Sequence, residues 1–135
     1  MVYRRIRIKD WTIRFLFSFD RYNKAQVLES LFWVDAPNSI VSKVSKNIEA
    51  GRLNEGFCYS DPTLRRTVFA TGKAENGPEV LDSIVHEIFH IVQHIAIEDG
   101  IDIYSEDAAY LAGDISREIS DIVCELSCPH CSRKV

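Results

Sequence analysis

The sequence predicts an α+β domain. Segments rich in β-forming residues occupy much of its first half, and the clearest of them, residues 11–19, partly alternates apolar and polar residues. The second half contains two segments, residues 80–96 and 106–126, whose apolar residues recur with the period of a helix. With 135 residues, 46% of them hydrophobic, the chain can build one core without disulfides. We therefore expect a single domain with a small sheet packed on helices.

The N-terminal elements follow from local patterns. Residues 3–9 partly alternate apolar and basic side chains, which is typical of an edge strand with charged outward positions. The segment 11–19 predicts a second strand. A helix is expected from about residue 20 to residue 33, and Pro37 ends that segment because proline cannot continue a helix.

A second helix and a hairpin are expected before the central motif. Asn38 or Ser39 can cap a helix that stops at Gly51. Residues 57–59 and 66–70 then resemble two strands, with Ser-Asp-Pro turn chemistry directly after the first of them. This pattern predicts a β-hairpin.

The central motif is HExxH, formed by His86, Glu87 and His90 inside an apolar helical run. On a helix the two histidines lie roughly 40° apart around the axis and roughly 6 Å apart along it, so both imidazoles can reach one ion. Two neutral histidines and a third ligand leave one position of a tetrahedral zinc open for water, and a nearby carboxylate can take that water's proton. Glu87 is therefore the candidate general base. The alternative is two surface histidines with an incidental glutamate between them.

The rest of this helix has a broad apolar arc. A helix this apolar is expected to be mostly buried, with the histidines facing a cleft. The arc consists of Leu81, Ile84, Val85, Ile88, Phe89, Ile91, Val92, Ile95 and Ala96.

A third ligand can come from the next helix. Ser105 is a plausible N-cap, and Glu106 begins the polar stripe of the helix that follows. A short turn at Gly100 could bring Glu106 back toward the two histidines. Asp107 is the competitor, either as the ligand or as an acceptor for a ligand histidine's other N–H. Alternatively, both acids only favour the helix dipole.

Two further residues belong to the candidate site. Three histidines at i, i+4 and i+8 fan around a helix and cannot all approach one tetrahedral ion, so we expect His94 at the rim of the site. Tyr110 lies one turn after Glu106 and can either assist a tetrahedral intermediate or pack against His90, and we favour packing.

These motifs resemble those of a known family. HExxH, a glycine-containing turn and then Glu-x-x-Ala-Tyr at residues 106–110 are similar to the gluzincin metallopeptidases, in particular to small gluzincin-like proteins of bacterial prophages and mobile elements. The resemblance covers residues 56–119. It implies a zincin-like domain, here residues 1–123, with Zn²⁺ held by His86, His90 and Glu106, and with Glu87 as the base. It further implies a peptide or protein substrate and a hairpin edge beside the motif helix. The alternative is that the hairpin only covers the core.

The C-terminal residues 124–135 form a cysteine-rich tail. Cys124, Cys128, His130 and Cys131 could hold a second, structural zinc ion or take part in a contact with a protein partner. A redox pair and an ordinary reduced tail are the alternatives. Stable disulfides are not expected in the cytoplasm.

Charge and hydropathy limit the partners. A net charge of −4 and a pI near 5.5 argue against a nucleic-acid partner. We also expect no membrane segment, because no apolar run approaches roughly 20 residues, and no signal peptide, so the predicted location is cytoplasmic. The predicted function is zinc-dependent hydrolysis of peptide bonds. The alternative is a non-catalytic, zinc-stabilised binding protein on the zincin scaffold.

Overall fold

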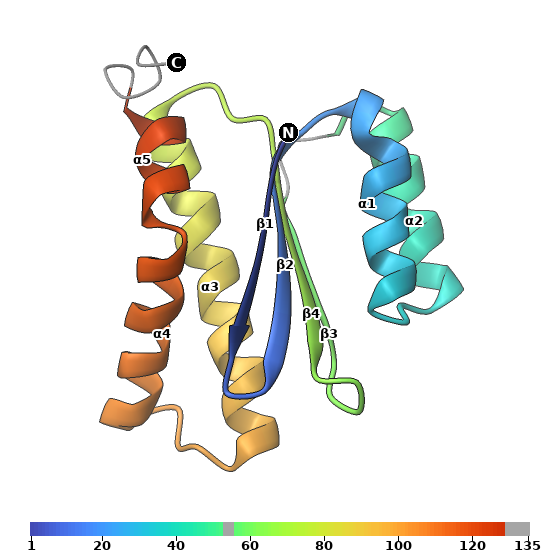
Figure 1. The fold of residues 1–135 in the computed structure, drawn as a ribbon. Coiled ribbons are helices and arrows are strands. Elements are labelled where there is room, and N and C mark those ends of the chain that lie inside the picture. The colour runs from blue at the N-terminus through green and yellow to red at the C-terminus, as the bar shows by residue number, and fades with distance from the viewer. Residues whose placement is uncertain (53–55, 129–135) are drawn as a thin grey trace. The chain divides into compact units, whose positions relative to one another are not determined.

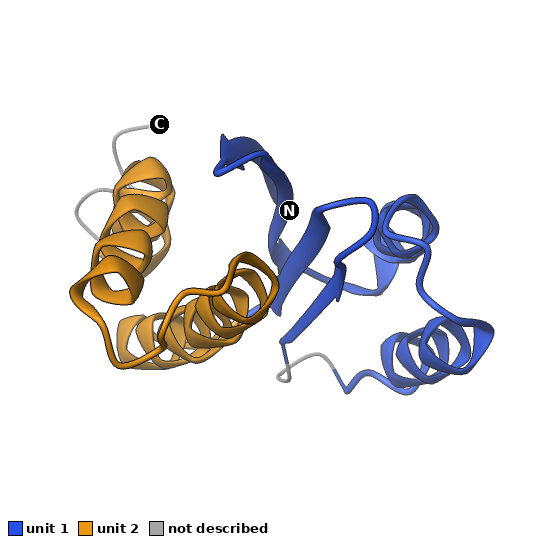
Figure 2. Ribbon diagram, turned by 90° about the horizontal axis from the view of Figure 1, so that it is seen from below, with its two compact units in different colours: residues 1–73 blue, residues 74–135 orange. Residues whose placement is uncertain are grey.

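The computed structural model describes residues 1–52 and 56–128. The fold of this part of the chain is α+β, as predicted, with a mixed four-stranded sheet and five α-helices. The chain divides into two compact units, residues 1–73 and residues 74–135, which Figure 2 shows in different colours. The first unit contains the whole sheet, and the second contains the HExxH helix.

The sheet of the first unit has the strand order β1-β2-β4-β3 (Figure 1). Strands β1 (Val2–Ile8) and β2 (Trp11–Phe19) are antiparallel, and β2 runs parallel to β4 (Arg66–Gly72). Strand β3 (Phe57–Asp61) pairs antiparallel with β4. The predicted edge strand and the predicted hairpin are therefore both present. The hairpin turn comes later than predicted, because Asp61 still pairs with Arg66 and its side chain accepts hydrogen bonds from the next backbone N–H groups.

Two helices lie on the same side of this sheet in the first unit, α1 (Lys24–Trp33) and α2 (Asn38–Glu49) (Figure 1). A single 3₁₀ turn precedes α1 and is capped by Asp20. The predicted cap of α2 was wrong, because Pro37 occupies the N-cap position and no side chain caps the helix. The Pro37 carbonyl instead accepts hydrogen bonds from Ile40 and Val41.

The core beneath α1 and α2 is formed by apolar side chains of β2 and β4 and of the two helices. Burial of such side chains is the main stabilising term for a unit of this size. The buried members are Leu16, Phe19, Val27, Leu31, Val34, Ala36, Ile48, Val68 and Ala70. A second buried cluster lies on the other face of β2 and β4. In it the ring centroids of Phe15, Phe17 and Phe69 are 4.9–5.6 Å apart.

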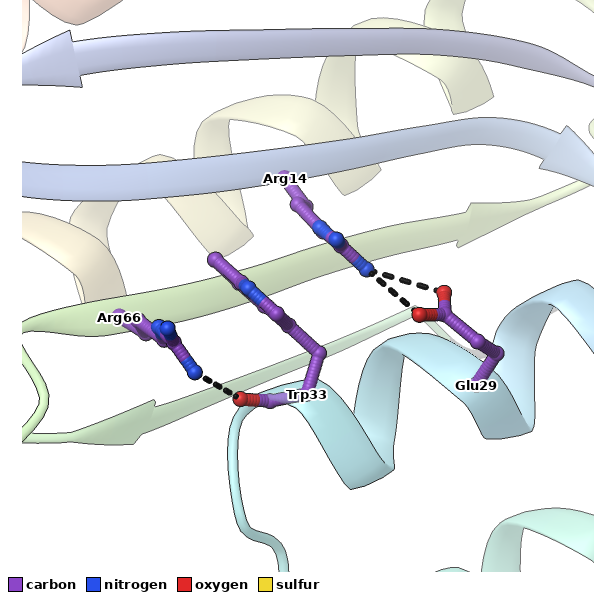
Figure 3. A network of polar contacts seen from close by, with 4 residues as sticks. All are labelled: Arg14, Glu29, Trp33 and Arg66. Atoms are coloured by element: carbon purple, nitrogen blue, oxygen red, sulfur yellow. Dashed lines mark hydrogen bonds and ion pairs between the residues drawn. The ribbon is translucent and has the colours of Figure 1, made fainter.

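A polar network ties α1 to the sheet (Figure 3). The Trp33 ring lies beside two guanidinium groups, 4.1 Å from that of Arg14 and 5.0 Å from that of Arg66. Arg14 Nη1 donates to both carboxylate oxygens of Glu29, at 3.2 and 2.9 Å, and Arg66 Nη1 donates to the Trp33 carbonyl at 3.0 Å. Cations placed over an indole ring are attracted by its negative face, so these contacts fix the end of α1 over β2 and β4.

The second unit begins with α3 (Gly77–Asp99), the helix that carries HExxH. The side chain of Asn76 caps it by accepting from the Glu79 N–H, and Pro78 lies in its first turn. The helix ends at Gly100, whose φ of 68° is left-handed and favours glycine. Helix α3 is long and apolar enough to cross a membrane. The central helix of a soluble domain can have the same length and composition, so this property does not distinguish the two.

The predicted second helix of this unit is divided in two. Ser105 caps α4 (Glu106–Glu118) as predicted, by accepting from the Ala108 N–H. The helix is interrupted at Ile119, whose N–H bonds to the Ser116 carbonyl, and α5 (Ser120–Ser127) follows. Both α4 and α5 pack along α3 (Figure 1). The predicted boundary between residues 123 and 124 falls inside α5.

Candidate metal-binding site on helix α3

The two histidines of HExxH lie together on α3. Their Nε2 atoms are 3.2 Å apart, and their rings meet edge to face with centroids 4.9 Å apart. This arrangement needs only the helix itself, because residues four apart occupy adjacent turns of one face. A hydrogen bond between these two atoms requires the tautomer in which one Nε2 carries the proton and donates to the other.

This spacing also fits a shared metal ion. Zinc binds histidine nitrogen at about 2.0–2.1 Å, so two nitrogens at tetrahedral positions on one ion lie about 3.3–3.4 Å apart. The observed separation of 3.2 Å is close to that value. The pair can therefore take one ion with little movement of either side chain.

Glu87 lies beside the pair but is buried. Its residue is 5% exposed, and its Oε1 atom is 3.8 Å from His86 Nε2. Burial raises the pKa of Glu87, and the charges of His86 and His90 only partly offset that effect. A carboxylate with a raised pKa is a stronger base than an exposed one, which is the property that a general base requires.

His94 lies one turn beyond His90, and the two ring centroids are 6.4 Å apart. Its pKa is lowered, first by burial and then by the charge of His90. The larger separation is consistent with the rim position expected from the sequence.

The structure does not bring Glu106 to the histidine pair. Glu106 begins α4 and lines a hollow together with Val85, Phe89 and Val92 of α3, and none of the described residues lining that hollow is a histidine. Asp107 follows it in the first turn of α4 and is exposed. Nowhere in residues 1–52 and 56–128 do three His, Cys, Asp or Glu side chains form a group that could hold a metal ion. Glu106 and Asp107 as ligands therefore stay predictions.

Tyr110 does not pack against His90, contrary to our expectation. It is 66% exposed, and no ring contact joins it to His90 in the described part of the chain. The physical reason is helical phase: the buried stripe of α4 contains Ala108 and Leu111, and Tyr110 lies roughly 100° or more from both around the axis.

The predicted cysteine site falls partly outside the described residues. Cys124 is exposed on α5, and Cys128 directly follows that helix. His130 and Cys131 lie outside the described part of the chain.

The prediction that the apolar arc of α3 is buried was wrong in part. Leu81, Val85 and Phe89 are 54–56% exposed, whereas Ile84, Ile91 and Ile95 are buried. An apolar period identifies the face that favours burial but not how much of that face a neighbour covers. The width of the apolar arc is the sequence signal for this exposure, because the arc is wider than the surface that one packed helix covers.

No protein-family model, curated protein or solved structure matches this chain. A functional assignment therefore depends on the chemistry of the residues themselves.

Proposed function

We propose that this protein is a zinc-dependent hydrolase of peptide bonds, in which His86 and His90 bind the metal and Glu87 is the general base. The observation that carries the proposal is the 3.2 Å separation of the two Nε2 atoms next to a buried carboxylate of raised pKa. A zincin-like domain over residues 1–123 belongs to the same proposal. It is supported by the order of elements, in which a mixed sheet precedes the HExxH helix and a second helix follows it.

Each residue has a defined role in this proposal. Bound zinc would polarise a carbonyl and lower the pKa of a water molecule to about 7. His86 and His90 would hold the ion through nitrogens of neutral imidazoles. Glu87 accepts the proton of the attacking water on its carboxylate and later returns it to the leaving amine.

Glu106 is the third protein ligand in this proposal, and Asp107 is the alternative. In the present conformation Glu106 lines the neighbouring hollow, so it must leave that hollow to join the histidines. Single replacements distinguish the two residues. The variant that removes the true ligand, Glu106→Ala or Asp107→Ala, should weaken zinc binding at least tenfold, and the other should not.

The test combines metal content with turnover. Wild type purified without added chelator should contain one zinc per chain at the HExxH site, lost in His86→Gln and His90→Gln. Glu87→Gln should keep zinc but lose hydrolysis of a fluorogenic peptide library by about 10²–10⁴-fold. A Cys128→Ser/Cys131→Ser double variant shows whether a second ion is bound in the tail. Hydrolysis retained by Glu87→Gln would exclude this mechanism.

A non-catalytic, zinc-stabilised binding protein is the second candidate function. It is favoured by the position of Glu106 away from the histidine pair, since a catalytic zinc normally has three protein ligands. This candidate predicts that zinc binds and raises the free energy of unfolding, while wild type and Glu87→Gln both fail to cleave the peptide library.

A further inference from the structure

An apolar groove runs along the second unit between α3 and the two helices that follow it. Two hollows in this region share Val85, Ile88 and Ser116, so they are continuous. We call this feature the α3/α4 groove. The residues that form its apolar lining on α3 include Leu81, Val85, Ile88 and Phe89, and Ala109 and Val123 lie opposite.

The side of the groove formed by α3 contains large apolar side chains that are exposed to solvent, although such side chains are usually buried. Leu81, Val85 and Phe89 follow one another at i, i+4 and i+8 and are 54%, 56% and 56% exposed. Residues at this spacing form a single stripe on a helix surface. A stripe of large apolar side chains left in water marks an interaction site more often than scattered single residues do.

The unit that contains the groove is strongly acidic. Residues 74–135 contain thirteen acidic and three basic residues, a net charge of −10, while residues 1–73 have a net charge of +6, which together give the −4 of the chain. Arg117 is the one Lys or Arg between residues 74 and 128. Its Nη2 atom lies 4.0 Å from Oδ1 of Asp114, so its charge is paired with an acidic side chain of the same helix. Glu106 lines the groove, and no hydrogen bond or ion pair engages its carboxylate within the described residues.

We propose that the α3/α4 groove binds a basic amphipathic helix of a partner protein. The apolar face of that helix would cover Leu81, Val85 and Phe89. Its Lys and Arg side chains would be attracted by Glu106 and by the net negative charge of the unit. The groove is lined by residues of α3, α4 and α5 and by residues 103–105 of the connection before α4. No strand edge is among the described residues that line it, so an occupant must satisfy its own backbone hydrogen bonds. A helix does so and an extended strand does not. A second copy of this unit is disfavoured because two units that each have a net charge of −10 repel one another.

This inference goes beyond the proposed hydrolase and needs no metal, so the two can fail separately. The probe is a fluorescein-labelled 18-residue peptide with leucine at i, i+3, i+4 and i+7 and lysine on the other face. One control peptide has the same composition in scrambled order, and another has glutamate in place of lysine. Fluorescence anisotropy on the full chain, with a chelator and physiological salt, should show that both controls bind at least tenfold more weakly.

Two matched variants locate the binding surface. Phe89→Ser removes a ring from the groove, whereas Ile97→Ser removes an 80% exposed apolar side chain elsewhere on α3. Phe89→Ser should weaken binding of the lysine peptide about tenfold or more, and Ile97→Ser should change it less than about twofold. Circular dichroism confirms that both variants are folded.

Three results would overturn the proposal. Equal binding of the scrambled peptide would mean that charge alone attracts the probe. Equal binding of the glutamate peptide would show that the negative charge of the unit does not contribute to binding. A wild-type dimer in sedimentation that dissociates in Phe89→Ser would show that a second copy occupies the groove.

Discussion

The Oε1 atom of Glu87 lies 3.8 Å from the Nε2 atom of His86, yet the two side chains meet different environments. The Glu87 side chain is 7% exposed and the His86 side chain is 66% exposed. Sequence neighbours on a helix are about 100° apart, so one can lie in the protein interior while the other faces water. The proposed base is therefore desolvated while the proposed ligand stays accessible to an ion from solution.

The stability of the metal-free protein should depend on the charge of Glu87. Because burial raises its pKa in the folded state, the folded protein binds this proton more tightly than the unfolded chain does. The stabilisation is complete below the unfolded pKa of about 4.3 and is lost as pH rises through the folded value. Glu87→Gln cannot ionise, so relative to wild type its free energy of unfolding should increase with pH across this interval. Urea unfolding at several pH values with a chelator measures this difference, and a difference independent of pH would contradict the prediction.

Zinc should stabilise the protein through the histidine pair. A ligand at 100 times its Kd adds about 2.7 kcal/mol to the free energy of unfolding when it binds only the folded state. His86→Gln and His90→Gln should abolish this gain. His94→Gln is the control on the same helix and should retain it, because His94 is expected only at the rim. Thermal unfolding with and without zinc checks all three, and loss of the gain in His94→Gln would make His94 a ligand.

Two glycines of the second unit should respond in opposite directions to alanine. A Cβ at Gly77 would lie 2.6 Å from the backbone carbonyl oxygen of Ser127, so Gly77→Ala should force α3 and α5 apart and cost about 1–3 kcal/mol. A Cβ at Gly113 would meet nothing within 4 Å. Gly113→Ala in the middle of α4 should therefore stabilise by about 0.5–1 kcal/mol through helix propensity. Denaturant midpoints compare the two, and equal effects would show that the α3–α5 approach is not tight.

Trp33 should contribute to the stability of the first unit through its two cationic neighbours. Trp33→Leu keeps an apolar side chain but removes the ring beside Arg14 and Arg66, and it should cost about 1–2 kcal/mol. Tyr22→Leu is the control, because Tyr22 is 80% exposed and its ring lies 5.6 Å from the Arg21 guanidinium carbon. We expect that change to stay within about 0.5 kcal/mol. Equal losses in denaturant unfolding would mean that the Trp33 ring adds nothing specific.

Local chemistry allowed several elements to be predicted from the sequence. Gly100 at a helix end and Ser105 as a cap are preferences of a few consecutive residues, and the structure confirms both. The proximity of His86 and His90 is equally local, because one turn of helix determines it. The interruption at Ile119 was not predicted, since the apolar period continues through it.

Contacts between elements were decided only by tertiary packing. The apolar arc of α3 is wider than its neighbours in the second unit cover, so Leu81, Val85 and Phe89 stay exposed although their period favoured burial. The position of Glu106 depends on how α4 is rotated and which side of α3 it packs against, and its spacing from HExxH along the chain does not determine either. A residue pattern specifies which face of a helix is apolar, because side-chain direction follows the backbone. The partner of that face is selected by the sum of many weak, non-directional contacts, which only the folded chain brings together.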